Sequence, residues 1–189
     1  FFITTSILIY NQFKHYLSFD YGFSSKNIVN IELQGVDYQK LSNELRDVTG
    51  VTTISASDLI PSTGTNNGNQ MRKSGSTGEY SEGGILITDE NFIDNLDIKL
   101  LAGKHLPPAG ESSDRFVLVN EAAVKNLGYN HPSEILGEVF ETKWGNEQLE
   151  VIGVVKDFRY KLLLNEDKIG PLIMRNQPEH FEYLNVQLS

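Results

Sequence analysis

The sequence predicts a mixed α/β (α+β) fold, on three observations. Strand-like runs rich in β-branched residues recur along the chain, at residues 27–34, 51–57 and 115–120. An amphipathic helical pattern separates the first two runs. A long polar segment begins at residue 58 and separates the early strands from the late ones, which predicts an insertion. The length of 189 residues allows one domain, or two small lobes that share a core.

The first elements form a predicted β-α-β unit of about 30 residues, the usual length for a crossover connection. Apolar and polar residues alternate in NIVNIELQ, residues 27–34, as in a strand with one better-buried face. Asp37 is expected to cap the helix that follows, and Gly50 sits where a left-handed residue is wanted. The strand VTTISAS, residues 51–57, completes the unit.

Two glycine-rich segments come next and predict long loops. They are DLIPSTGTNNGNQ, residues 58–70, and SGSTGEYSEGG, residues 74–84, with a short strand possible at MRK between them. A strand is expected at 83–89, where Asp89 is placed to cap a short helix. An extended run at 98–106 follows this helix.

The second half of the chain predicts a further strand-helix pair and a hairpin. RFVLVN, residues 115–120, is an apolar run typical of a strand covered on both faces. Asn120 is expected to cap the next helix, which Gly128 closes. One helical turn at PSEILG precedes a hairpin over 138–155, with its turn at Gly145-Asn146. FEYLNVQLS is the last predicted strand.

Composition excludes several classes of function. Acidic residues outnumber basic ones by 25 to 16, for a net charge of −9, which argues against binding nucleic acid or anionic lipid. The chain has no cysteine, so disulfides and thiolate metal sites are excluded. The apolar opening FFITTSILIY is interpreted as the outer portion of a membrane-spanning helix. The alternative is an amphipathic helix packed on its own domain.

No constellation of residues predicts catalysis, a metal or a cofactor. The chain lacks a G-x-S-x-G motif and a phosphate-binding G-K-[ST] motif, and its four histidines are scattered at positions 15, 105, 131 and 180. Asp157 ends the apolar strand VIGVV and is the one carboxylate considered as a general base. Capping of the following turn is the commoner use of such a residue, and we favour it.

The order of the motifs resembles the MacB-type periplasmic core domain of FtsX-like ABC transporter permeases, most closely those common in Bacteroidetes-type bacteria. The segments that carry the resemblance are DYGFSSKNIVNIEL, VTTISASDLIPS, ITDENFIDNLDIKLLAGK, FVLVNEAAVKNLG, GYNHPSEILGEVF and VIGVVKDFRY. The resemblance covers residues 17 to about 188. Each motif alone is weak, and their common order makes the case.

This resemblance implies an architecture and a location. Residues 1–18 would be the outer end of the first transmembrane helix. Residues 19–60 and 144–189 would form a porter-like lobe, and residues 61–143 an inserted Sabre-like lobe. The domain would lie in the periplasm, as part of an inner-membrane protein. The family often adds a helix and a strand after the last strand, and the chain stops before them, at Ser189.

The resemblance also implies a non-catalytic role, in which ATP-driven movement of membrane helices reaches the periplasmic lobes and promotes substrate extrusion or release. The expected partners are a second permease copy, in a homo- or heterodimer, a cytoplasmic ATPase subunit or domain, and an optional periplasmic adaptor. The loops at 61–69 and 74–84 are the expected contact regions, with Met71 and Tyr80 as exposed anchors.

Two alternatives stay open at this point. One is a ligand-sensing ectodomain of a membrane receptor such as a histidine kinase, which shares flanking helices and a mixed α/β core. The other is a stand-alone envelope enzyme, which requires a pocket where Asp157 or another acid meets a base.

Overall fold

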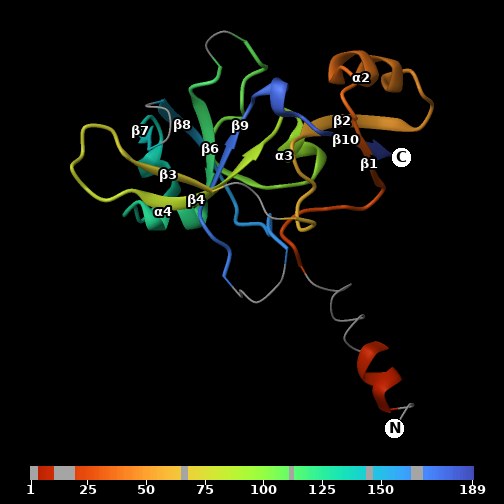
Figure 1. Cartoon of the computed structure of the whole chain (residues 1–189), viewed down its shortest axis with the longest axis horizontal. Helices are drawn as coiled ribbons and strands as arrows, with labels where there is room; N and C mark the ends of the chain where they lie inside the picture. Colours follow the sequence, from red (N-terminus) through yellow and green to blue (C-terminus); the bar gives the residue numbers. More distant parts are fainter. Residues whose placement is uncertain (1–3, 11–19, 65–67, 111–112, 144–146, 163–167) are drawn as a thin grey trace.

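The computed structural model describes residues 4–10, 20–64, 68–110, 113–143, 147–162 and 168–189. The described residues form two sheets with a few short helices, which confirms the predicted mixed α/β fold (Figure 1). The strands are β1 (Ile28–Glu32), β2 (Val51–Ser57), β3 (Gly68–Lys73), β4 (Ser81–Ile87), β5 (Leu100–Gly103), β6 (Phe116–Asn120), β7 (Val139–Thr142), β8 (Gln148–Val155), β9 (Leu172–Arg175) and β10 (Tyr183–Leu188). The helices are α2 (Tyr38–Arg46), α3 (Phe92–Asn95), α4 (Glu121–Asn126) and the 3₁₀ turns η1 (Pro132–Ile135) and η2 (Pro178–His180).

The smaller sheet has three strands in the order β1-β10-β2. The last strand, β10, lies between the first two and pairs antiparallel with both, so β1 and β2 run parallel. The predicted β-α-β unit is therefore confirmed, with β10 inserted between its strands. Asp37 caps α2, because its Oδ1 accepts a hydrogen bond from the Lys40 backbone N–H at 2.8 Å.

Helix α2 covers one face of this sheet. Its apolar stripe packs on a core to which β2 and β10 contribute Ile54 and Leu184. The ring of Tyr38 meets Phe181 edge-on, with 4.9 Å between the ring centroids. The helix ends at Arg46, and Gly50 has the expected positive φ, +95°, just before β2 begins.

The larger sheet has seven strands in the order β5-β8-β6-β9-β4-β3-β7. Strand β7 also pairs with β8, so six of these strands form a closed ring. Strand β5 pairs with the second half of β8, beyond the stretch that β7 occupies. Closure leaves few unpaired backbone groups along the ring, which lowers the risk of edge-to-edge aggregation.

Strands β6 and β9 are buried on both faces, as the apolar run at 115–120 predicts. Successive residues alternate between two apolar clusters, so Leu118 joins one cluster, while Val117 and Val119 join the other. The first cluster packs under α3 through Phe92. The second packs under α4 through Val124. Asn120 caps α4 as predicted, because its Oδ1 accepts from the Ala123 N–H at 3.0 Å.

The two sheets meet where β2 and β4 end. Ser57 and Thr88 form an isolated antiparallel bridge, and Asp58 exchanges two hydrogen bonds with the backbone of Ile87. Behind this junction, Asn95 of α3 donates to Ser55 Oγ at 2.8 Å and to the Asn185 carbonyl at 2.7 Å. These contacts fasten the smaller sheet to α3 and to the ring.

The late part of the chain contributes to both sheets: β8 and β9 belong to the larger sheet, and β10 belongs to the smaller one. The smaller sheet takes its strands from residues 28–57 and 183–188, hence from both ends of the chain. Strands β8 and β9, within the segment 144–189 assigned to the porter-like lobe, pair with strands of the segment 68–142. The division into named lobes with the boundaries given above stays a prediction.

Residues 4–10 are helical and all seven of their side chains are exposed. Among the residues that the structure describes, no helix has the length and apolar character needed to cross a membrane. The aromatic stripe of 13–19 and the turn at Gly145-Asn146 lie outside the described residues. The helix after Asp89 begins later than predicted: Asn91 is its N-cap residue, and Asp89 Oδ1 accepts from the Asn91 N–H.

Candidate functional site

The β3–β4 hairpin contains the part of the chain singled out for partner contact. Its strands pair antiparallel, with Met71 opposite Ser81, and residues 74–80 connect them. The predicted short strand at 71–73 is thus the end of a longer strand that begins at Gly68. The ring holds both sides of the hairpin, because β3 pairs with β7 and β4 pairs with β9.

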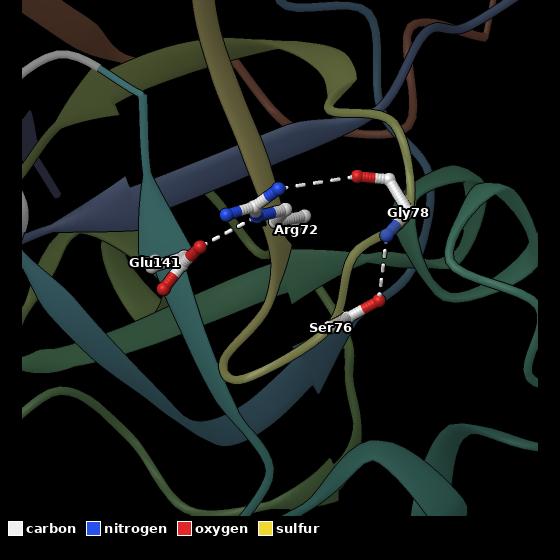
Figure 2. Close-up of polar contacts among 4 residues, drawn as sticks. All are labelled: Arg72, Ser76, Gly78 and Glu141. Carbon is white, nitrogen blue, oxygen red and sulfur yellow. Dashed lines mark hydrogen bonds and ion pairs between the residues drawn. The ribbon is translucent and has the colours of Figure 1, made fainter.

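Arg72 links β7 to the connecting segment, because its side chain lies between Glu141 and Gly78 (Figure 2). Its Nε donates to Glu141 Oε1 of β7 at 2.5 Å, and its Nη1 donates to the Gly78 carbonyl at 3.4 Å. The Gly78 N–H donates to Ser76 Oγ at 3.0 Å, which tightens the same turn. The hydrogen bond with Glu141 raises the pKa of Arg72 above its usual range. The hairpin tip is therefore ordered by side chains of its own strand and of β7.

Cations and aromatic rings gather around this hairpin. The guanidinium carbon of Arg72 lies 4.6 Å from the centroid of the half-buried Tyr80 ring, and Lys143 Nζ lies 6.0 Å from it. Lys73 Nζ pairs with Glu138 Oε2 at 2.7 Å and approaches the Tyr129 ring. We call this area the hairpin surface, comprising residues 72–80 with Tyr129, Glu138, Glu141 and Lys143. Its three cations are balanced by the carboxylates of Glu79, Glu138 and Glu141, so this surface has no net charge on a chain of net charge −9.

The two anchor residues have different environments. The expectation that Met71 is exposed is wrong: its side chain is 5% exposed and packs in the cluster with Phe140 and Ile173. Residues alternate along a strand, so burial of Met71 places Arg72 on the outer side. Tyr80 lies on the hairpin surface, half-buried against Arg72. Its contact role stays a prediction.

Sequence reasoning missed Arg72 and Glu141. They are 69 positions apart, and only the pairing of β3 with β7 brings them together. The basic residues of MRK, placed between two glycine-rich segments of an acidic chain, were the signal that could have indicated a site of paired charges.

Asp157 serves as a cap, as favoured, but the expectation that it caps the turn after it is wrong, because it caps the N-terminus of α4, which lies earlier in the chain. Its Oδ1 accepts from the Ala122 N–H of α4 at 2.9 Å, and its own N–H donates to Glu121 Oε2 at 3.0 Å. Burial, and then the nearby Glu121 carboxylate, raise the pKa of Asp157 above its usual range. This reciprocal exchange satisfies the N-terminus of α4.

The described histidines lie apart from one another, in local structural contacts. His105 Nδ1 lies 3.4 Å from Asp94 Oδ2, and His131 forms a capping box with Glu134 at η1. His15 lies outside the described residues. Across the part of the chain that the structure describes, no three His, Cys, Asp or Glu side chains are grouped to hold a metal ion.

Comparison with models of known protein families gives a match for this chain. The model of the MacB-like periplasmic core domain matches residues 1–178, almost the whole chain. The chain belongs to the MacB-like periplasmic core domain family. It is thus a domain of an ABC transporter permease, and it lies outside the cytoplasm. A search of curated proteins finds no match.

Solved structures share the fold of this MacB-like domain. The periplasmic region of MacB from Actinobacillus actinomycetemcomitans superposes with a TM-score of 0.54 at 14% identity, over 92% of this chain and 79% of that chain. A domain of a putative permease from Porphyromonas gingivalis gives 0.52 at 17% identity, over 78% and 66%. The extracellular domain of the transporter YknZ from Gram-positive bacteria gives 0.52 at 15%, over 84% and 78%. At these identities the likeness concerns the fold alone.

Proposed function

We propose that this MacB-like domain is a non-catalytic module that passes the movement of membrane helices to a partner or cargo in the periplasm. ATP would be hydrolysed by a cytoplasmic subunit or domain. The other permease copy would contribute a second module, and a periplasmic adaptor is an optional further partner. In this proposal residues 1–18 belong to the first helix of an inner-membrane protein. The family match favours this role over a receptor ectodomain or an envelope enzyme.

The observation that carries the proposal is the joining of the two chain ends in one sheet. The Leu188 N–H donates to the Asn27 carbonyl at 2.8 Å, and Gln187 Nε2 donates to the Lys26 carbonyl at 3.2 Å. The segment that enters β1 is therefore bonded to the end of β10. A displacement applied at either end would act on the same three strands, as a coupling element requires.

Strand β4 offers a route from this sheet to the hairpin surface. It begins at Ser81, beside the hairpin tip, and ends at Ile87, which is bonded to Asp58 at the junction of the sheets. Seven extended residues span about 23 Å at roughly 3.3 Å per residue. A rotation of the smaller sheet about the junction would then move the hairpin surface relative to the membrane.

Distance measurements in the full-length permease test the proposal. Spin labels on cysteines at Glu44 of α2 and Ser76 of the hairpin report the position of the two sheets, and the domain has no other cysteine. The distance between the labels is expected to differ between the nucleotide-free and the vanadate-trapped transporter. In a second pair, Ser76 lies in the β3–β4 connection and Asn126 in α4, which packs on the ring, so the distance between their labels is expected to stay constant. Identical distance distributions for the first pair in both states would refute the coupling role.

The hairpin surface is the proposed partner contact, and photocrosslinking tests it separately. A photoreactive phenylalanine analogue at Ser76, at the exposed tip, is expected to crosslink to a partner or cargo in cells. The same analogue at the exposed Val48, after α2, serves as the control. Equal crosslinking from both positions would remove the hairpin surface as a specific contact.

A further inference from the structure

A pocket of about 230 Å³ lies between α2 and residues 89–91, at the edge of the smaller sheet. Its floor is apolar and is formed by Ile54, Ala56 and Leu184. Residues of α2 form one wall, among them Tyr38 and Ser42, and the segment before α3 forms the other. The pocket therefore lies between the smaller sheet with its helix α2 and the segment that follows β4, and it shares no lining residue with the hairpin surface.

The two walls carry opposite charges. Arg46 lines the pocket from α2, while Asp89 and Glu90 line it from the other wall. No ion pair within 4.0 Å joins Arg46 to either carboxylate among the salt bridges of the described residues. Arg46 Nη1 instead donates to Asn43 Oδ1 at 3.4 Å, and Glu90 Oε2 accepts from Asn176 at 3.1 Å. The guanidinium of Arg46 and the carboxyl groups of Asp89 and Glu90 thus line one space without an ion pair between them.

We propose that this pocket binds a small aliphatic α-amino acid. The ammonium group would bind to Asp89 and Glu90, and the carboxylate to the Arg46 guanidinium, whose fork of donors matches a carboxylate. The aliphatic side chain would lie on the apolar floor of Ile54, Ala56 and Leu184. A ligand with both charges satisfies both walls at once, whereas a ligand with one charge leaves one wall unpaired.

The size and the polar lining agree with this class of ligand. Pockets for drug-sized molecules measure about 300–1,000 Å³. A pocket of about 230 Å³ fits a smaller molecule. Gln39, Asn43 and Asn91 also line it, and they offer amide groups that can bond the ligand's charged ends. The inference does not depend on the proposed coupling role, because it rests on the pocket alone.

Binding is expected to depend on pH through Asp89. Burial is the main reason that the pKa of this carboxyl is raised to about 7; Glu90 beside it also raises the pKa, while hydrogen bonding with the Ala56 backbone and with Asn91 lowers it. A neutral Asp89 does not attract an ammonium group, so protonation competes with the ligand. Affinity should therefore rise about tenfold between pH 6 and pH 8 for a group that titrates near 7.

Calorimetric titration of the 189-residue chain with L-leucine tests the inference. Two analogues serve as matched controls: 4-methylpentanoate, which lacks the ammonium group, and isoamylamine, which lacks the carboxylate. L-Leucine is expected to bind at least tenfold more tightly than either analogue. No binding of L-leucine, or equal binding of all three compounds, would overturn the proposal.

Substitutions locate the site. Asp89→Asn and Arg46→Gln are each expected to weaken L-leucine binding at least tenfold, and Asp89→Asn should also abolish the rise with pH. Glu44→Gln lies on the same helix, on the exposed side away from the pocket, and should bind as the unsubstituted chain does. Binding that survives both pocket substitutions in folded protein would place the ligand elsewhere and contradict the assignment.

Discussion

At the residue scale, the exchange between Asp157 and Glu121 shows how a carboxylate that suggests chemistry serves the fold. Asp157 Oδ1 accepts a hydrogen bond from the N–H of Ala122, the residue after Glu121. Glu121 Oε2 in turn accepts one from the N–H of Asp157. These two hydrogen bonds connect the N-terminus of α4 to the segment that follows β8. Both carboxylates are occupied by backbone donors in the resting fold.

The Asp157→Ala variant is expected to lower the free energy of unfolding by about 1 kcal/mol, the usual effect of removing a helix cap. Asp157→Asn keeps an oxygen acceptor and should cost less. Urea unfolding followed by circular dichroism measures both. A catalytic Asp157 would behave differently: transport by the full-length permease would then be lost with Asp157→Asn, while stability would hardly change.

The carboxyls of Asp58 and Asp89 flank the junction of the two sheets. Burial raises the pKa of Asp58 to about 6, although its Oδ1 accepts the Ile87 N–H; nearby Glu182 raises it and His180 lowers it. Burial likewise raises the pKa of Asp89 to about 7. In both cases the folded chain holds a proton more tightly than the unfolded chain does.

These two shifts make stability depend on pH. Between about pH 4 and pH 7 the folded state binds more protons at these groups than the unfolded state, so their contribution to stability falls as pH rises. We expect Asp89→Asn to flatten the decrease in melting temperature between pH 5 and pH 7.5. Melting curves at several pH values measure this. An unchanged slope would show that Asp89 titrates at its ordinary pKa.

At the element scale, strands β5 and β8 approach so closely that two glycines are required. Gly103 has φ +80°, and a Cβ there would lie within van der Waals overlap of the Ile152 carbonyl oxygen. Gly153 lies opposite Gly103, and a Cβ on it would overlap the Lys104 carbonyl oxygen. The pair lets β5 lie against β8 where β7 no longer does.

Gly103→Ala is expected to destabilise the chain by more than about 2 kcal/mol, because it combines a strained φ with a backbone clash. Gly137→Ala is the matched control. Gly137 has the same φ, +80°, and open space around its missing Cβ, so it should cost only about 1–2 kcal/mol. Equal losses in denaturant unfolding would show that the close approach costs nothing.

Sequence patterns predicted the local elements well and the pairing between them poorly. The cap at Asp37, the cap at Asn120 and the last strand at β10 are all confirmed, since each depends on neighbouring residues. The predicted hairpin over 138–155 is confirmed by the antiparallel pairing of β7 with β8, but ring closure also requires β7 to pair with β3, which no local signal encodes. The hairpin surface was missed in part for the same reason: Arg72 meets Glu141 only through that pairing.

At the scale of the whole molecule, the main feature is the narrow junction that joins the two sheets. The backbone link between β2 and the end of β4 consists of the Ser57–Thr88 bridge and the bonds of the residues beside it. The Asn95 contacts add a buried polar fastening. Movement between the sheets would have to bend this region, because the ring and the three-stranded sheet are each continuously paired.

A disulfide across the junction is expected to block transport. Bridge partners in antiparallel strands have Cα atoms about 4.5–5.5 Å apart, within the range that a disulfide spans. Ser57→Cys with Thr88→Cys would form the only disulfide of this domain, since the chain has no cysteine. Transport by the full-length permease should fall under oxidising conditions and recover with dithiothreitol. Each single cysteine variant is the control, and full transport by the crosslinked protein would contradict movement at the junction.

The closed ring has a practical consequence for engineering and for evolutionary divergence. Since β3 pairs with β7 and β4 pairs with β9, we expect that the seven residues 74–80 between the two strands can be exchanged without disturbing the ring. Tip sequences from other transporters could be grafted onto this scaffold as interchangeable recognition loops. In the proposed role of the hairpin surface as the partner contact, such exchanges would change what the domain contacts and leave the scaffold constant.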